Sequence, residues 1–304
     1  MAFEPPRRLV DALTERYGAP RADAWLGRLP ALAADAVAAR GLTVERLVAP
    51  GGRDSLLLLV RRPDGAPAAL KIAPPFADPG GERAALAHWK GWGAVETYDA
   101  DADAGGPGAG DGSVLIERLR PEVSLRSLPD AKALLEAAGT IRRLWVDPPE
   151  GHGFETVEER TGRQAGPMRA GRAPAVLVEA ALDARAAMVG SAVDEVLLHG
   201  AFRQGKVLAG ERAPWLAVGP EPVVGERAYD LARPARDRVE DLVASESGAS
   251  SARRRMNRLA DSLDVDRDRL RAWALFRAVE SATRALDAGR GPAAEVLLEF
   301  ASWL

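Results

Sequence analysis

The sequence predicts an α+β fold in which a β-rich N-terminal part precedes a helical C-terminal part. Between residues 42 and 72, three short apolar segments are separated by Gly51-Gly52 and by Pro63-Asp64-Gly65, a pattern typical of a small antiparallel sheet. Beyond Pro121 most segments carry apolar residues at helical spacing instead. The 304 residues, 47% of them hydrophobic, suffice for one large domain or two lobes with substantial cores.

The expected elements of the N-terminal part follow in order. Residues 5–40 predict two helices, punctuated by Gly18 and Pro20. Strands are expected at 42–48, 55–61, 68–72 and near 94–98, with a helix at 81–92. The run from Asp99 to Asp111 is acidic and glycine-rich, so we expect a mobile loop there.

In the C-terminal part, helices are expected at 130–145 and 173–189, and the final third is helical. The region 151–172 is rich in glycine and arginine and is expected to be irregular. Two short strands, around 197–198 and 215–218, are separated by a loop with a His-Gly corner and followed by a Gly-Pro turn.

Composition excludes several classes of partner and site. With 41 basic and 44 acidic residues the net charge is -3, so neither nucleic acid nor a membrane surface is an expected partner. The sequence has no cysteine and three histidines, which argues against disulfides and a zinc site. No apolar run approaches 18 residues and residues 1–8 lack a signal-peptide core, so we expect a cytoplasmic protein, of a GC-rich bacterium by its alanine and arginine content.

The most informative stretch is 197–208 (LLHGAFRQGKVL) with 215–222 (WLAVGPEP). It resembles the catalytic and metal loops of the aminoglycoside phosphotransferases, in particular the streptomycin 6-phosphotransferase and hydroxyurea phosphotransferase group. That group reads His-Gly-Asp-Leu-His-x-Gly-Asn-Val-Leu and then Trp-Leu-Ala-Ile-Asp-Pro-Lys. Residues 224–232 (VGERAYDLA) are similar to its Val-Gly-Asp-Pro-Ala-Tyr-Asp-Leu-Ala, and 270–275 (LRAWAL) to a helix near its C-terminus.

The resemblance covers essentially the whole chain and implies a bilobal, protein-kinase-like fold. It implies an N-lobe with N-terminal helices and an antiparallel sheet over 1–118, and a helical C-lobe over 119–304. Residues 113–119 resemble the family's strand and hinge, where the backbone meets an adenine ring. Glu117 and Arg118 are therefore ligand-binding candidates.

The resemblance also shows which chemical groups differ. Phosphoryl transfer needs an Asp that takes the proton of the attacking hydroxyl, and an Asn and a second Asp that hold magnesium. By position, Ala201 replaces the base, Lys206 the Asn and Gly219 the metal-binding Asp. The Lys206 charge would repel a divalent ion, because two like unit charges about 4 Å apart repel by roughly 4 kcal/mol and a divalent ion doubles this. No magnesium site is expected.

Residues that support the family's site remain. Lys71 ends a strand and Glu82 lies on the next helix, as in the kinase pair that holds the phosphates. His199 and Asp230 match a structural brace, in which we expect Asp230 to bind the backbone of the His199 corner. Residues 281–286 (SATRAL) depart from the family's Ser-Ala-x-Trp-Ser-Leu, and Glu280 before them replaces an apolar residue, which argues against an aminoglycoside acceptor.

These residues predict a catalytically degenerate, pseudokinase-like member of the family. It would bind a small anionic or natural-product ligand, or a protein partner, in the interlobe cleft. The ligand-binding candidates are Lys71, Glu82, Glu117, Arg118, Arg203, Lys206 and Glu221. No cofactor is expected, and whether ATP binds stays open.

Two alternatives stay open beside this reading. One is a repurposed, metal-independent enzyme of secondary metabolism, and the other a weak ATP-dependent O-phosphotransferase in which Glu221 recruits the metal. The favoured reading adds a geometric expectation. Lys206 and Glu221 should form an ion pair within about 4 Å, with the ammonium in the place of the metal cation.

Overall fold

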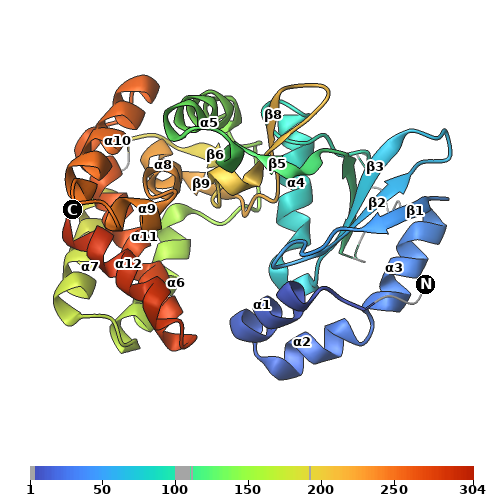
Figure 1. Ribbon diagram of the computed structural model, residues 1–304, viewed down its shortest axis with the longest axis horizontal. Helices are drawn as coiled ribbons and strands as arrows, with labels where there is room; N and C mark the ends of the chain where they lie inside the picture. Colours follow the sequence, from blue (N-terminus) through green and yellow to red (C-terminus); the bar gives the residue numbers. More distant parts are fainter. Residues whose placement is uncertain (1–3, 100–109, 111, 192) are drawn as a thin grey trace. The chain divides into compact units, whose positions relative to one another are not determined.

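The computed structural model describes residues 4–99, 110, 112–191 and 193–304 and divides into two compact units (Figure 1). Unit 1 comprises Met1–Val123 and Leu208–Val218, and unit 2 comprises Ser124–Val207 and Gly219–Leu304. Unit 1 contains the larger sheet and unit 2 most of the helices, so the predicted α+β class is confirmed. The first unit extends beyond residue 118, and 208–218 returns to it, because this hairpin adds strands to a sheet of unit 1.

The main sheet of unit 1 has four antiparallel strands in the order β1-β2-β3-β4. These strands are β1 (Thr43–Leu47), β2 (Leu56–Arg61), β3 (Pro67–Ile72) and β4 (Ser113–Glu117). Their bounds lie within two residues of those expected, from the apolar runs and turn signals for β1 to β3 and from the family resemblance for β4. In β2 and β3, Leu58 and Leu70 pair across the strands and point to the same face. Lys71 therefore points to the opposite face, since side chains alternate along a strand.

Three helices rather than the expected two precede the sheet: α1 (Arg7–Tyr17), α2 (Ala19–Leu26) and α3 (Leu29–Ala39). The predicted break at Gly18 is present, with φ at +83°. The second break, at Gly27, was missed because apolar residues continue at helical spacing across it. Apolar side chains of these helices form one core with the Leu58 and Leu70 face of the sheet.

Unit 1 also contains helix α4, short 3₁₀ turn η1 and a second sheet in the order β5-β7-β8. Their bounds are α4 Pro79–Trp89, η1 Pro75–Ala77, β5 Arg120–Ser124, β7 Val207–Ala209 and β8 Trp215–Ala217. The strand expected near 94–98 is wrong, since this segment makes only isolated bridges, through Ala94 to Ala217 and through Thr97 to Ile116. Bridges of this kind fix a segment between two sheets without extending either.

Asp99 begins the acidic run that predicts a loop, but its side chain is largely enclosed within unit 1. Its two carboxylate oxygens accept from Arg40 Nε and Nη2 at 3.1 and 3.0 Å, and Oδ2 also accepts from the backbone N–H of Leu115 at 2.7 Å. Such a bidentate pair positions the start of the loop. Residues 100–109 and 111, for which the loop was predicted, lie outside the described residues, as do residues 1–3 at the N-terminus.

Unit 2 is organised around its longest helix, α11, which packs against α6, α7, α8, α10 and α12. Its helices are α5 (Asp130–Leu144), α6 (Val157–Ala170), α7 (Ala175–Val189), α8 (Arg227–Ala235), α9 (Val239–Val243), α10 (Gly248–Leu263), α11 (Arg267–Asp287) and α12 (Gly291–Ser302). Its remaining elements are the antiparallel pair β6 (Val196–Leu198) and β9 (Val223–Gly225), with turns η3 (Leu125–Ser127) and η4 (Gln204–Lys206).

Helix α6 corrects the irregular region expected at 151–172. Gly162, Gly166 and Pro167 obscure its helical pattern, because each is a poor residue for a helix interior. The signal that sets its start is a capping box, in which the Thr156 hydroxyl accepts from Glu159 N and the Glu159 carboxylate accepts from Thr156 N.

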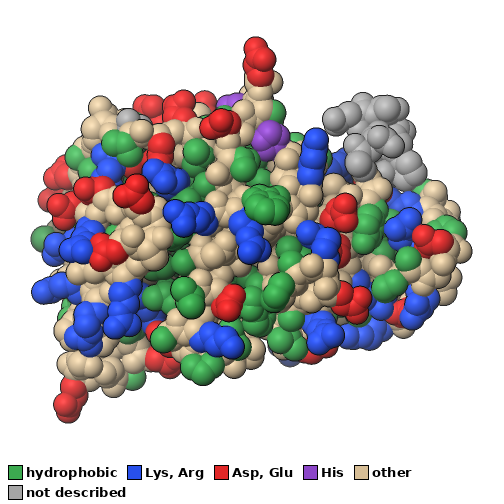
Figure 2. Space-filling view, turned by 90° about the horizontal axis from the view of Figure 1, so that it is seen from above, with side chains coloured by type: hydrophobic (Ala, Val, Ile, Leu, Met, Phe, Trp, Pro, Cys, Tyr) green, Lys and Arg blue, Asp and Glu red, His purple; other side chains and the backbone are tan. Residues whose placement is uncertain are grey.

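On the face drawn in Figure 2, acidic and basic side chains are interspersed and form no continuous basic band. Within the described ranges, no helix combines the length and the apolar composition needed to cross a membrane.

Candidate functional site

The His199-Gly200 corner follows strand β6 and is held by a buried carboxylate. Asp230, from α8, accepts the backbone N–H of His199 at 3.0 Å and that of Gly200 at 2.9 Å. These are the backbone contacts that the sequence predicts for Asp230. Burial raises the pKa of Asp230, while Arg277, the two backbone N–H groups and the Trp145 indole oppose this rise.

Glycine is the one residue type that fits position 200 of this corner. Its φ is +71°, and a Cβ atom would lie 1.9 Å from the backbone oxygen of Glu221. The strands on either side are joined here, since Glu221 N donates to His199 O at 3.0 Å. Two arginines complete the support. Arg277 Nη2 donates to Gly200 O at 2.7 Å, and Arg160 Nη1 donates to Glu221 O at 2.8 Å.

Lys206 connects the loop after this corner to the Gly-Pro turn. Its Nζ donates to the backbone oxygen of Gly219 at 2.7 Å and lies 3.5 Å from Glu221 Oε1. The predicted ion pair therefore exists within its expected distance. The Lys206 side chain is 18% exposed and that of Glu221 39%, so the ammonium is the more enclosed partner. A fixed positive charge thus lies against the carbonyl group of Gly219.

The rest of the loop is packed rather than open. Ala201 is completely buried, and its N–H donates to His199 Nδ1 at 3.3 Å. Gln204 is buried too, and its N–H donates to Asp237 Oδ2 at 2.7 Å. Burial raises the pKa of Asp237 to about 6, although the Gln204 N–H and the guanidinium of Arg203 act in the opposite direction. Arg203 is thereby placed near the Asp237 carboxylate.

The side chains at this loop do not fit the magnesium ion that kinase-like folds use. A magnesium site needs oxygen ligands with near-octahedral geometry. Ala201 offers no ligand, Gly219 offers only a carbonyl that Lys206 already occupies, and the ammonium adds a positive charge. Over the described ranges, no three His, Asp or Glu side chains converge as a metal-binding group would.

In unit 1, Lys71 of β3 and Glu82 of α4 form a short ion pair. Both side chains are largely buried. Helix α4 is fixed at its start by Asp78, whose Oδ1 accepts from Gly81 N at 3.0 Å, and Glu82 follows in the first helical turn. The structure thus brings together the two residues that the sequence pairs.

Glu117 and Arg118, the candidates at the end of β4, interact with unit 1 itself. Glu117 is buried and accepts from Arg212 Nη2 at 2.8 Å. Arg118 donates to Val60 O at 2.6 Å and to Ala68 O at 3.2 Å, where β2 ends and β3 begins. Both side chains stabilise unit 1 itself. Of these two residues, only the backbone could therefore make the contact with an adenine ring that the family resemblance implies.

Sequence reasoning missed Arg160, Arg277 and Asp237. The two arginines donate hydrogen bonds to backbone oxygens more than 60 residues away in the sequence. The sequence alone does not indicate which carbonyl group an arginine side chain will contact. Asp237 has no such signal either, because it lies in the turn after α8 and its contact with Gln204 N joins residues 33 positions apart.

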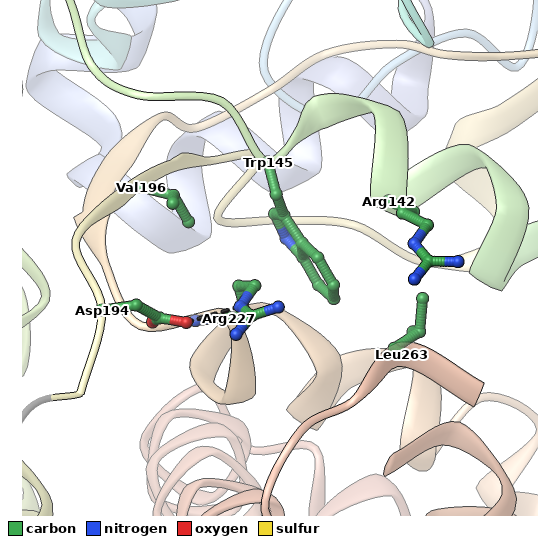
Figure 3. Close-up of a pocket in the computed structure, with 6 residues that line it drawn as sticks. All are labelled: Arg142, Trp145, Asp194, Val196, Arg227 and Leu263. Atoms are coloured by element: carbon green, nitrogen blue, oxygen red, sulfur yellow. Dashed lines mark hydrogen bonds and ion pairs between the residues drawn. The ribbon is translucent and has the colours of Figure 1, made fainter. Parts of the chain in front are cut away.

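A separate pocket of about 370 Å³ lies in unit 2 at the other end of β6, beside Val196 (Figure 3). Arg227 pairs there with Asp194 at 2.5 Å and lies 5.9 Å from the centre of the Trp145 ring. Arg142 and Leu263 complete its lining. The pocket contains none of the residues that the sequence singles out.

Comparison with solved structures supports the fold. Choline kinase LicA from Streptococcus pneumoniae superimposes with a TM-score of 0.60 at 10% identity, over 90% of this chain and 99% of that one. The crystal structure of aminoglycoside phosphotransferase APH(4)-Ia gives a TM-score of 0.58 at 16% identity, with the same coverage. At these identities the likeness concerns the fold alone.

Comparison of sequences is more specific. The family model described as "Aminoglycoside/hydroxyurea antibiotic resistance kinase" matches residues 40–289. Streptomycin 6-kinase of Streptomyces glaucescens is 32% identical over 308 residues, which cover 97% of this chain and 96% of that protein. Hydroxyurea phosphotransferase of Kitasatospora aureofaciens is 36% identical over 289 residues, 91% of this chain and 79% of that protein. The chain therefore belongs to the aminoglycoside/hydroxyurea antibiotic resistance kinase family.

Proposed function

We propose that this family member binds a small anionic molecule without a divalent metal ion and does not transfer phosphoryl groups by the base and metal chemistry of kinases. The observation that carries the proposal is the Lys206 ammonium, fixed 2.7 Å from Gly219 O and 3.5 Å from Glu221 Oε1. Through the family resemblance, these are the positions of the metal-binding Asn and Asp and of the lysine that follows the Asp.

The absence of a catalytic base is a second argument for the proposal. Ala201 occupies the place of the Asp that takes the proton of the acceptor hydroxyl, and its methyl group cannot accept a proton. The carboxylates that accept hydrogen bonds from this loop are already engaged: Asp230 accepts from His199 N and Gly200 N, and Asp237 Oδ2 accepts from Gln204 N. Losing a general base commonly costs two to four orders of magnitude in rate, about 10² to 10⁴.

The class of ligand follows from charge. A lysine ammonium that replaces a metal cation keeps a positive charge at the loop, so a phosphate or carboxylate group is favoured over a polycationic aminoglycoside. A natural-product intermediate with such a group is the partner that we propose. Its binding should weaken with salt, because the attraction is electrostatic.

ATP-dependent phosphorylation of a small molecule is the second candidate. The Lys71–Glu82 pair favours it, because kinases use such a pair to hold the ATP phosphates. The relatives named streptomycin 6-kinase and hydroxyurea phosphotransferase favour it as well.

One experiment separates the two candidates. Transfer of labelled phosphate from ATP to streptomycin and to hydroxyurea is measured with magnesium and with EDTA, beside calorimetric titration of ATP under both conditions. We expect no transfer, and any ATP binding should be the same in EDTA as in magnesium. Magnesium-dependent transfer that is lost in Lys71→Ala would establish the kinase instead.

A further inference from the structure

Four arginines of unit 2 converge where α8 packs against α11. Arg233 lies in the last turn of α8 and Arg236 directly follows that helix, while Arg277 and Arg284 are two turns apart on α11. The spacing of seven residues places Arg277 and Arg284 on one face of α11, and Arg236 N donates to Arg233 O at 3.1 Å in the turn that ends α8. We refer to these four side chains as the arginine cluster.

The carboxylates near the arginine cluster are fewer than its cations. Glu280 of α11 lies 3.6 Å from Arg284 Nη2. Burial raises the pKa of Glu280, but the surrounding guanidinium groups, Arg284 foremost, outweigh burial and hold that pKa below its ordinary value. Glu221 interacts with Arg233 electrostatically, yet it also pairs with Lys206. Asp230 interacts electrostatically with Arg277 as well. Three carboxylates therefore face the four arginines and Lys206, which leaves a net positive charge.

Most members of the cluster have protein partners, but one does not. Arg277 donates to Gly200 O at 2.7 Å, and Arg236 Nη2 donates to Ser281 Oγ at 2.8 Å. No hydrogen bond or ion pair within 4 Å joins the Arg233 guanidinium to any described residue, although the side chain is half-buried. A half-buried guanidinium that has five donors and no acceptor is poorly satisfied by the protein alone.

The energetics of the cluster agree with this geometry. Burial, and then the charge of Arg277, lower the pKa of Arg233 to about 10. Burial and the charges of Arg233 and Arg277 lower the pKa of Arg236 to about 9. The end of a helix favours a cation, which helps Arg236. It does not cancel the repulsion between the arginines, whereas a bound anion would.

We propose that the arginine cluster binds the oxyanion group of a small molecule, either a phosphate or a carboxylate. Arg233 and the 46% exposed Arg284 are the accessible members that contact it. The inference rests on the proposed function, because it assigns residues to the charged group of the same ligand. It uses side chains other than Lys206, so the two can be tested separately.

Thermal unfolding in EDTA tests the inference, with sodium phosphate and sodium acetate compared against sodium chloride at equal ionic strength. The variants are Arg233→Gln, Arg284→Gln, Lys206→Met and, as the matched control, Arg258→Gln, an exposed arginine on α10. We expect phosphate or acetate to raise the Tm of the wild type and of Arg258→Gln. In Arg233→Gln the apparent Kd should rise at least about tenfold, the effect of one charge-assisted hydrogen bond.

A second readout separates an anion site from a structural role. Without added oxyanion, Arg233→Gln should unfold at the same or a higher temperature than the wild type, because it relieves repulsion with Arg277; a structural arginine would lower it. Equal oxyanion effects in the wild type, Arg233→Gln and Arg284→Gln would overturn the inference, as would no effect in the wild type. An effect lost in Lys206→Met alone would overturn the cluster and leave the proposed function standing. The phosphate and acetate arms identify the oxyanion.

Discussion

The ammonium of Lys206 donates a hydrogen bond to the carbonyl oxygen of Gly219 across 2.7 Å. That oxygen is the ligand atom that Gly219 could offer to a metal, so the ammonium and a metal ion would compete for it. Because Lys206 is largely enclosed, its charge is also less screened than that of a surface lysine. The loop therefore contains a cation that the protein itself supplies, the ammonium group of Lys206.

Restoring the family's chemistry should require three substitutions together. Ala201→Asp alone returns a base without a metal, and Lys206→Asn with Gly219→Asp returns ligands without a base. Asp is tolerated at 219, where φ is +60°, better than most residues are. We expect magnesium-dependent ATP turnover in the triple variant to exceed that of each partial variant by about 10² or more. If Ala201→Asp alone matched the turnover of the triple variant, a metal site would have to exist without the other two substitutions.

Asp230→Ala should destabilise the protein rather than alter a ligand contact selectively. The substitution leaves the N–H groups of His199 and Gly200 buried without their acceptor, at a cost of about 1–3 kcal/mol. Urea unfolding measures it, with Asp183→Ala, an exposed residue of α7, as the control. An unchanged unfolding midpoint for Asp230→Ala would remove this residue from the corner's support.

Gly200→Ala should be more damaging than an ordinary glycine replacement. Its Cβ would meet the Glu221 carbonyl at 1.9 Å, and φ at +71° is unfavourable for alanine. Together these predict a loss of at least about 2 kcal/mol in the free energy of unfolding. Gly153→Ala is the matched control, because a Cβ there meets nothing within 4 Å and the backbone has no positive φ. Equal stability of the two variants would mean that the corner rearranges freely.

The elements that local patterns determine could be predicted from the sequence. Turn signals at Gly51-Gly52 and Pro63-Asp64-Gly65 set the strands on either side, and the motif around Asp230 identified its backbone contacts. The segment 94–98 has a strand's composition, but its partners come from two different sheets and no ladder forms. Tertiary contacts, rather than the composition of the segment, therefore determine that it is not a strand.

The convergence of arginine side chains in unit 2 could not be predicted in the same way. Arg233, Arg236 and Arg277 belong to a chain that uses arginine almost everywhere in place of lysine, so none of them stands out by residue type. Their convergence depends on how α8 packs against α11, and this packing is set by apolar side chains elsewhere on the two helices. A periodicity identifies the faces of a helix but not the helix that each face meets.

The loop after the His199 corner should respond to pH through Asp237. The pKa of this carboxyl is about 6 in the folded protein, against an ordinary value of 3.8, with burial as the largest cause. The folded state therefore binds the proton more tightly than the unfolded state. The stabilisation by the protonated form is complete below pH 3.8 and is lost as the pH rises through about 6.

Asp237→Asn should consequently become favourable as the pH rises. The difference between the two pKa values corresponds to about 3 kcal/mol, an upper limit for the advantage of Asn over ionised Asp at neutral pH. The Asn side-chain oxygen can still accept from Gln204 N, so the loop's hydrogen bond is kept. We expect the free energies of unfolding of wild type and Asp237→Asn to converge toward pH 4 and to separate, with the variant more stable, between pH 5 and 7. Asp183→Asn, at an exposed position of α7, is the matched control. A difference that is constant across this pH range would show that Asp237 does not titrate there, and that its carboxylate is better solvated or better paired than its burial indicates.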